Sequence, residues 1–97
     1  MNIIFRLQGI EFEWDEKKAE SNAEKHGITF EEAAEVFTDP FYQGGDASDN
    51  YEQRDFIIGY SFSQKLLLVV HTERGKRTRI ISARPATRHE RKTYEEL

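Results

Sequence analysis

Five arginines lie close together near the carboxyl end of the chain, and their side chains suit the binding of phosphate. They are Arg77, Arg79, Arg84, Arg88 and Arg91. A guanidinium group binds phosphate through two parallel hydrogen bonds and keeps its charge in a cleft. In a regular strand Arg77 and Arg79 share one face and Arg84 lies on the other, so the three converge only if the strand bends, bulges or ends before Arg84. The alternative is an ordinary solvated face of basic residues.

Two other positions offer groups that could move a proton. Glu52 and Arg54 would face the same side if a strand begins that early, and a carboxylate beside a guanidinium suits a general base near bound phosphate. The pair equally suits a cross-strand ion pair. His26 ends a predicted helix, where it could act as an acid, contact phosphate, or simply satisfy the last carbonyl groups of its own helix.

No pattern typical of a metal or cofactor site is present in the sequence. The histidines His26, His71 and His89 have no metal-ligand spacing, and no carboxylate cluster joins them. The chain has no cysteine, and it has no phosphate-binding glycine loop, dinucleotide fingerprint or nucleophile elbow. We therefore expect neither a metal nor a cofactor.

The elements that would position these residues begin with a strand and two helices. Residues 10–14 alternate apolar and acidic side chains, which is typical of a half-buried strand, and residues 1–7 form either an earlier strand or its extension. Asp15 can cap a helix over residues 16–26, which Gly27 can end. Thr29 and Glu32 form a capping box for a second helix, and Pro40 limits that helix.

The second half of the chain predicts a strand meander followed by a helix. Residues 41–42 could form a short strand, and residues 43–50 have the composition of a loop. Strands are predicted over residues 54–60, 66–72 and 77–84, with short connections that favour antiparallel pairing. Thr87 can cap a final helix over residues 88–97. Helices segregated from an antiparallel sheet define an α+β fold, and we expect one domain over residues 1–97.

Composition narrows the classes of protein further. No apolar run approaches 18 residues, and the first ten residues lack the plan of a secretory signal, so we expect a cytoplasmic protein with no membrane span. The net charge is −4, but it divides unevenly: residues 1–50 contain four Lys and Arg against twelve Asp and Glu, and residues 51–97 contain ten against six. This asymmetry indicates a surface for a polyanion or a partner on the basic half.

Several short motifs occur in an order that resembles the BrnT family of toxins. The most specific are Trp14-Asp15, Lys25-His26-Gly27-Ile28 and the run Arg79-Ile80-Ile81-Ser82-Ala83-Arg84. Glu52-x-Arg54, Ile58-Gly59, Leu68-Val69-Val70, Glu90-Arg91 and Tyr94 fit the same pattern. Each motif alone is weak, but their joint occurrence over residues 12–94 is specific.

The resemblance implies a fold and a function that composition could not supply. BrnT proteins are toxins of type II toxin–antitoxin pairs that resemble RelE-type ribonucleases, so we expect a RelE-like fold and a metal-independent endoribonuclease that arrests translation and growth. The 2′-hydroxyl would attack the adjacent phosphate to give a cyclic phosphate end. The expected partner is a BrnA-like antitoxin in a hetero-oligomer, with operator DNA bound only through the antitoxin.

The resemblance and the chemistry together suggest residue roles. Arg79 and Arg84 would stabilise the charged phosphate with help from Arg54, and Glu52 or His26 would serve as base or acid. The RNA backbone would be held by a further set of basic residues, namely Lys25, Arg77, Arg88 and Arg91. RNA would enter as a single strand or with an unstacked base, because a small domain cannot reach into the deep A-form groove.

Two other functions compete with the ribonuclease. The chain could be an inactive toxin-fold binding module that regulates transcription with its partner. It could also be a repressor that binds nucleic acid alone, although no helix-turn-helix or ribbon-helix-helix pattern supports this alternative. Loss of growth arrest on arginine substitution would distinguish the enzyme from the binding module.

Overall fold

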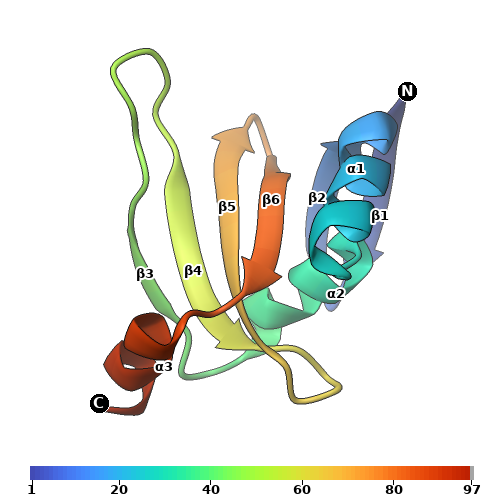
Figure 1. The fold of residues 1–97 in the computed structure, drawn as a ribbon. Coiled ribbons are helices and arrows are strands. Elements are labelled where there is room, and N and C mark those ends of the chain that lie inside the picture. Colours follow the sequence, from blue (N-terminus) through green and yellow to red (C-terminus); the bar gives the residue numbers. More distant parts are fainter. Residues whose placement is uncertain (97) are drawn as a thin grey trace.

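A single six-stranded sheet forms the centre of the molecule in this computed structural model, which describes residues 1–96 (Figure 1). The strands are β1 (Asn2–Leu7), β2 (Ile10–Asp15), β3 (Gln43–Asp46), β4 (Asp55–Tyr60), β5 (Leu66–Arg74) and β6 (Arg77–Pro85). The helices are α1 (Glu16–His26), α2 (Phe30–Glu35), the short 3₁₀ helix η1 (Val36–Thr38) and α3 (Arg88–Glu95). Leu97, predicted to end the last helix, lies outside the described residues. The α+β class is confirmed.

The sheet is mixed, with the order β1-β2-β6-β5-β4-β3. Strands β3 to β6 pair antiparallel in chain order, and β1 pairs antiparallel with β2 across a tight turn at Gln8 and Gly9, which both have positive φ. Strand β2 is parallel to β6 over only two register positions. The predicted N-terminal strand is therefore a hairpin that joins the meander through its second strand.

Helices α1 and α2 cover one face of the sheet (Figure 1), and the larger core lies beneath them. The alternation in β2 turns Phe12 and Trp14 into this core, where Trp14 meets the ring of Phe30 edge-on at 5.8 Å. The core is completed mainly by aliphatic residues, namely Ile28, Ala33, Ala34, Val36, Ile57, Leu67, Val69, Ile80 and Ala83. Burial of this apolar stripe is what fixes the two helices on the sheet.

We call the opposite side of the sheet the open face. Strand register assigns to it Glu11 and Glu13 of β2, Phe56 and Ile58 of β4, Leu68, Val70 and Thr72 of β5, and Arg77, Arg79, Ser82 and Arg84 of β6. Helix α3 covers one end of this face, where Tyr94 packs with Ile58 and Leu68. The Tyr94 hydroxyl donates to Asp39 at 2.6 Å, and burial together with this bond raises the pKa of Tyr94 to about 12.

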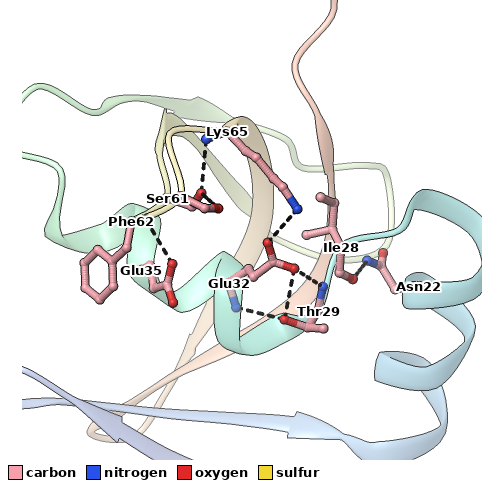
Figure 2. A network of polar contacts seen from close by, with 9 residues as sticks. Asn22, Ile28, Thr29, Glu32, Glu35, Ser61, Phe62 and Lys65 are labelled. Atoms are coloured by element: carbon pink, nitrogen blue, oxygen red, sulfur yellow. Dashed lines mark hydrogen bonds and ion pairs between the residues drawn. The ribbon is translucent and has the colours of Figure 1, made fainter.

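Helix boundaries follow the capping signals. Asp15 accepts from the Lys18 N–H at the start of α1, and Gly27 ends that helix in the left-handed conformation. The predicted capping box is present at α2, where the Glu32 side chain accepts from Thr29 and also from Lys65 (Figure 2). Thr87 and Glu90 form a second capping box at α3. These local bonds explain why the first residue of each helix was predictable.

The prediction for residues 41–46 was wrong. Phe41 and Tyr42 form a turn, stabilised by the Asp39 carboxylate, which accepts from the Phe41 N–H at 2.9 Å. Strand β3 instead occupies Gln43–Asp46, where a loop was expected. A Cβ on Gly45 would lie 2.6 Å from the Phe56 ring, so this strand needs glycine because an aromatic ring lies across it. Glycine at a strand position of this kind marks close approach and not a turn.

Asn22 joins α1 to the edge of β6. Its side-chain amide donates to the Ala83 carbonyl at 2.8 Å and accepts from the Ala83 N–H at 3.1 Å. The same nitrogen donates to the Ile28 carbonyl at 3.1 Å (Figure 2). One buried amide therefore takes the place of a neighbouring strand beyond the point where β2 stops pairing with β6.

We predict that Asn22→Leu lowers the free energy of unfolding by about 2 to 4 kcal/mol, because the buried Ala83 N–H and carbonyl groups lose their partner. Urea unfolding followed by circular dichroism measures the change. The control is Ser21→Ala, an exposed neighbour on the same helix. Equal stability of Asn22→Leu and wild type would contradict the role given to Asn22.

A second prediction concerns His71, which is 7 % exposed, lies edge-on to Phe37 and has no hydrogen-bond partner for either ring nitrogen among residues 1–96. Burial lowers its pKa from 6.5, against the opposing effect of Asp55 and Glu73. The unfolded chain then binds the proton more readily, so stability is full above about pH 6.5 and falls as the pH drops below it.

The measurement is the urea midpoint between pH 8 and pH 5.5 for wild type and His71→Phe. The wild type should lose stability over this range by more than the variant does. Parallel pH profiles for the two proteins would show that His71 does not become protonated on unfolding.

Candidate functional site

A bulge in β6 brings the three predicted strand arginines to the open face. The register pairs Val70 with Ser82 but His71 with Ile80, so Ile81 is an extra residue in β6. The extra residue reverses the alternation, and Arg84 therefore faces the same side as Arg77 and Arg79. The condition stated from the sequence, that the strand must bend, bulge or end before Arg84, is met by the bulge.

Arg54 and Arg79 lie on either side of Thr72, and we call these two arginines the arginine row. Thr72 is paired with Arg79, and because Asp55 is paired with His71, the preceding Arg54 lies beside Thr72. The Thr72 hydroxyl donates to the Gln53 carbonyl at 3.2 Å, which fixes this neighbourhood. Two strand spacings separate the Cα atoms of Arg54 and Arg79, or about 10 Å.

Arg77 and Arg79 are paired with carboxylates from β2. Arg79 donates to Glu13 at 2.5 Å and to the Asn2 side chain at 2.9 Å, and Arg77 is bonded to Glu11. Glu13 is only 5 % exposed. Hydrogen bonds from Arg77 and Arg6 lower the pKa of Glu11. The row is therefore not a free positive surface, and an incoming phosphate has to share or displace these contacts.

Sequence reasoning missed the acidic partners Glu11 and Glu13. The alternation in β2 indicated that they share a face, but nothing local indicated that this face would lie beside β6. Only the parallel pairing of Glu13 with Arg79 brings the two strands together.

Glu52 and Arg54 form a local ion pair before β4 begins. The Arg54 guanidinium donates to Glu52 at 2.7 Å, while the strand itself starts at Asp55, so strand alternation does not govern Glu52. Asp49 accepts from the Tyr51 and Glu52 N–H groups at 2.8 Å each, and these bonds lower the pKa of Asp49 and order the loop. The Nε atom of Arg54 is buried without a partner among residues 1–96.

Arg84 lies at the other end of the open face, against α3. Its guanidinium makes two bonds to Glu90, at 2.7 and 2.8 Å, and the Thr87 N–H donates to the same carboxylate at 2.9 Å. The Arg84 bonds are the main reason that the pKa of Glu90 falls to about 2. Arg84 lies five positions along β6 from Arg79, a distance of roughly 13 to 16 Å. The two arginines share a face but not a cluster.

The other predicted residues lie in two further places. Lys25 and His26 line a shallow groove of about 230 Å³ between α1 and the edge of β6, together with Lys18 and Ser82. On α3, Arg88 is exposed, and Arg91 donates to the Tyr60 hydroxyl at 3.4 Å. The structure thus places Arg54, Arg77 and Arg79 at the same end of the open face, with Glu52 bonded to Arg54, and leaves His26 and Arg84 apart from them.

The donor chemistry of the described residues is that of an anion site. In residues 1–96, no group of three or more His, Asp or Glu residues is arranged to hold a metal ion. Nor is any helix in that part of the chain long and apolar enough to cross a membrane. What the open face offers is guanidinium groups, their paired carboxylates and the Thr72 hydroxyl.

Comparison with known proteins identifies the family. A family model described as "Ribonuclease toxin, BrnT, of type II toxin-antitoxin system" matches residues 14–90. The chain belongs to the BrnT family. It is accordingly a ribonuclease toxin of a type II toxin–antitoxin system, as the order of sequence motifs indicated. The comparison with curated protein sequences finds no match.

A solved structure supports the fold of this BrnT-family toxin. The crystal structure of the Brucella abortus ribonuclease toxin BrnT is similar, with a TM-score of 0.57 and 23 % sequence identity. The similarity covers 77 % of this chain and 94 % of that one. At this level of identity the likeness concerns the fold, and the roles of individual residues are not transferred by it.

We predict that Glu90→Gln lowers stability by about 1 to 3 kcal/mol at pH 7, because an amide cannot replace two charge-assisted bonds to Arg84. Since the folded pKa of Glu90 is about 2 against 4.5, its stabilisation is present above about pH 4.5 and is lost as the pH falls towards 2. The difference between variant and wild type should therefore narrow from pH 5 to pH 3.

Urea unfolding at several pH values tests the prediction. Glu95→Gln is the control, because Glu95 is an exposed carboxylate on the same helix and its nearest basic atom, on Arg91, is 3.7 Å away. A pH-independent loss in Glu90→Gln would instead trace the effect to helix capping alone.

Proposed function

We propose that this toxin is a metal-independent endoribonuclease that cleaves RNA at the arginine row and so arrests translation and growth. The observation that carries the proposal is the placement of Arg54 and Arg79 on either side of Thr72, with the Glu52 carboxylate bonded to Arg54. Two arginines whose Cα atoms lie about 10 Å apart can hold one phosphate between their extended side chains. Since translation takes place in the cytoplasm, the proposed activity requires the toxin there.

The proposed reaction is a transfer within the RNA chain. The Glu52 carboxylate takes the proton from the ribose 2′-hydroxyl, whose oxygen attacks the adjacent phosphorus. The bond from phosphorus to the 5′-oxygen breaks, and that oxygen takes a proton from water, whose hydroxide then takes the proton held by Glu52. The products are a 2′,3′-cyclic phosphate and a free 5′-hydroxyl, as expected for a RelE-like ribonuclease. Arg54 and Arg79 stabilise the extra negative charge on the phosphorane.

The remaining basic residues are assigned to the RNA backbone and to the alternative acid. Arg77 extends the arginine row by one step, while Arg84, Arg88 and Arg91 lie at the α3 end of the open face. Lys25 would bind a phosphate in the groove beside α1. His26, in that same groove, is the second candidate for acid or base if the RNA passes around the edge of β6.

The proposed partner is a BrnA-like antitoxin in a hetero-oligomer. Membership of a type II toxin–antitoxin family supports an antitoxin as partner. Its DNA-binding part would carry any contact with operator DNA. The exposed glutamates of α1 and α2, namely Glu16, Glu20, Glu24 and Glu31, suit a positively charged antitoxin segment.

One observation favours a second function, that of an inactive binding module. Arg79 and Arg84 are each already bonded to a carboxylate, Glu13 and Glu90 respectively. An arginine neutralised in this way binds phosphate only when the phosphate competes with its partner. If phosphate cannot displace these carboxylates, the protein would keep its fold and its binding to the antitoxin but would not cleave RNA.

We predict that Arg79→Ala and Arg54→Ala each reduce RNA cleavage by about 10²- to 10³-fold, the usual cost of removing one donor to a charged transition state. Growth after induced expression and cleavage of a single-stranded RNA by purified protein measure the loss. Lys17→Ala is the control, because Lys17 is an exposed basic residue on α1, on the other side of the sheet. Full activity in both folded row variants would place the site elsewhere.

The products provide an independent prediction. Cleavage should continue in excess EDTA, and the new 3′ ends should resist phosphatase until acid opens the cyclic phosphate. Loss of activity in EDTA, restored by a divalent ion, would contradict the metal-independent reaction. A well-folded wild type without cleavage would favour the binding module.

A further inference from the structure

A hollow of about 540 Å³ occupies the open face beside the arginine row. Its floor is apolar and consists of Phe56, Ile58, Leu68 and Val70 from β4 and β5. Its rim is polar and comes from β3, β6 and α3, with Gln43, Arg84, His89, Glu90 and Thr93. A concave apolar floor with a few hydrogen-bonding groups at its edge is the usual plan of a site for a small planar ligand.

Strand register fixes how this hollow lies relative to the arginine row. Along β5, Thr72, Val70 and Leu68 point to the open face in succession, and successive members lie about 7 Å apart. Val70 is level with Phe56, and Leu68 is level with Arg84. The floor therefore begins one step from the arginine row, within the reach of a nucleotide whose phosphate is held there.

Gly45 in β3 leaves room for the Phe56 ring, which forms part of the floor of the hollow. A Cβ on Gly45 would lie 2.6 Å from the Phe56 ring, so only glycine allows the ring to lie across β3. The ring is half-buried and lines the hollow from this position. An aromatic ring placed against backbone with one side accessible is a platform on which a base can stack.

We propose that this hollow binds a nucleobase of the RNA strand next to the scissile phosphate. The base packs on Phe56 and the aliphatic floor, while Gln43, His89 and Thr93 are placed to bond its polar edge. The inference rests on the proposed function, because it takes the arginine row as the phosphate site. It adds a substrate contact that sets which nucleotide the toxin prefers.

The test measures binding without cleavage. The intact probe is a single-stranded hexanucleotide with 2′-O-methyl riboses, which lack the attacking hydroxyl. A set of otherwise identical probes each lacks the base at one position. Wild type should lose about 5- to 100-fold in affinity when the base at one position, or at either of two adjacent positions, is missing, the usual effect of one stacked base. Fluorescence anisotropy at fixed salt gives the affinities.

Thr93 allows the hollow to be filled without touching the floor. Thr93 is exposed on α3, and Thr93→Trp should place an indole in the hollow. The variant should bind the intact probe more weakly by a similar factor, and its affinity should no longer depend on the missing base. Thr93→Ala loses the same hydroxyl but leaves the hollow open, so it should keep that sensitivity. Circular dichroism verifies that both variants are folded.

Three results would overturn the proposal. They are no detectable binding of the probe, equal affinity for every base-deleted probe, or unchanged sensitivity in Thr93→Trp. If Thr93→Trp instead weakens the antitoxin complex and leaves RNA affinity intact, the hollow belongs to the antitoxin. The proposed function is tested separately: if Arg54→Ala and Arg79→Ala still cleave RNA as well as wild type, the proposed function is wrong.

Discussion

The buried amide of Asn22 is the interaction on which the arrangement of the site depends. Strand β2 runs beside β6 for only two register positions before the chain turns into α1. Beyond that point the edge of β6 would present unpaired backbone groups to the core, and the Asn22 side chain bonds both of them at Ala83. The bulge at Ile81 lies just before this position. The strand that carries Arg79 and Arg84 is thus held on one edge by β2 and α1 and on the other by β5.

Charge compensation is the second constraint on the open face. The three arginines of β6 there are each paired with a carboxylate, although the carboxylates come from separate elements: β2 for Arg77 and Arg79, and α3 for Arg84. Half-buried guanidinium groups without such partners would carry a desolvation cost and would repel one another. The pairing keeps the face stable in the absence of a ligand, and it neutralises the arginines that the proposed RNA site would use. It also makes phosphate binding a competition, which favours a ligand that engages several arginines together.

Local chemistry explains which elements were predictable. Helix α1 begins after Asp15 and ends at Gly27, and helix α3 begins after Thr87, because capping bonds join residues three or four apart in the chain. Strands β4, β5 and β6 follow from apolar runs separated by short turns. Strand β3 was mistaken for a loop because its two glycines have the composition of a turn, and the ring of Phe56 that requires Gly45 is eleven residues away in sequence.

The sequence by itself determined the family, the α+β class and the first residue of each helix, since motif order, alternation and capping are properties of neighbouring residues. It also identified arginines as the groups that suit phosphate. The tertiary structure decided which of them share a face and which share a neighbourhood. A one-residue bulge turned Arg84 to the side of Arg79, strand register set Arg54 beside Thr72, and the parallel contact of β2 with β6 supplied Glu13. These outcomes depend on how strands far apart in the chain pair, and strand pairing is fixed by the packing of the whole core and not by any local pattern.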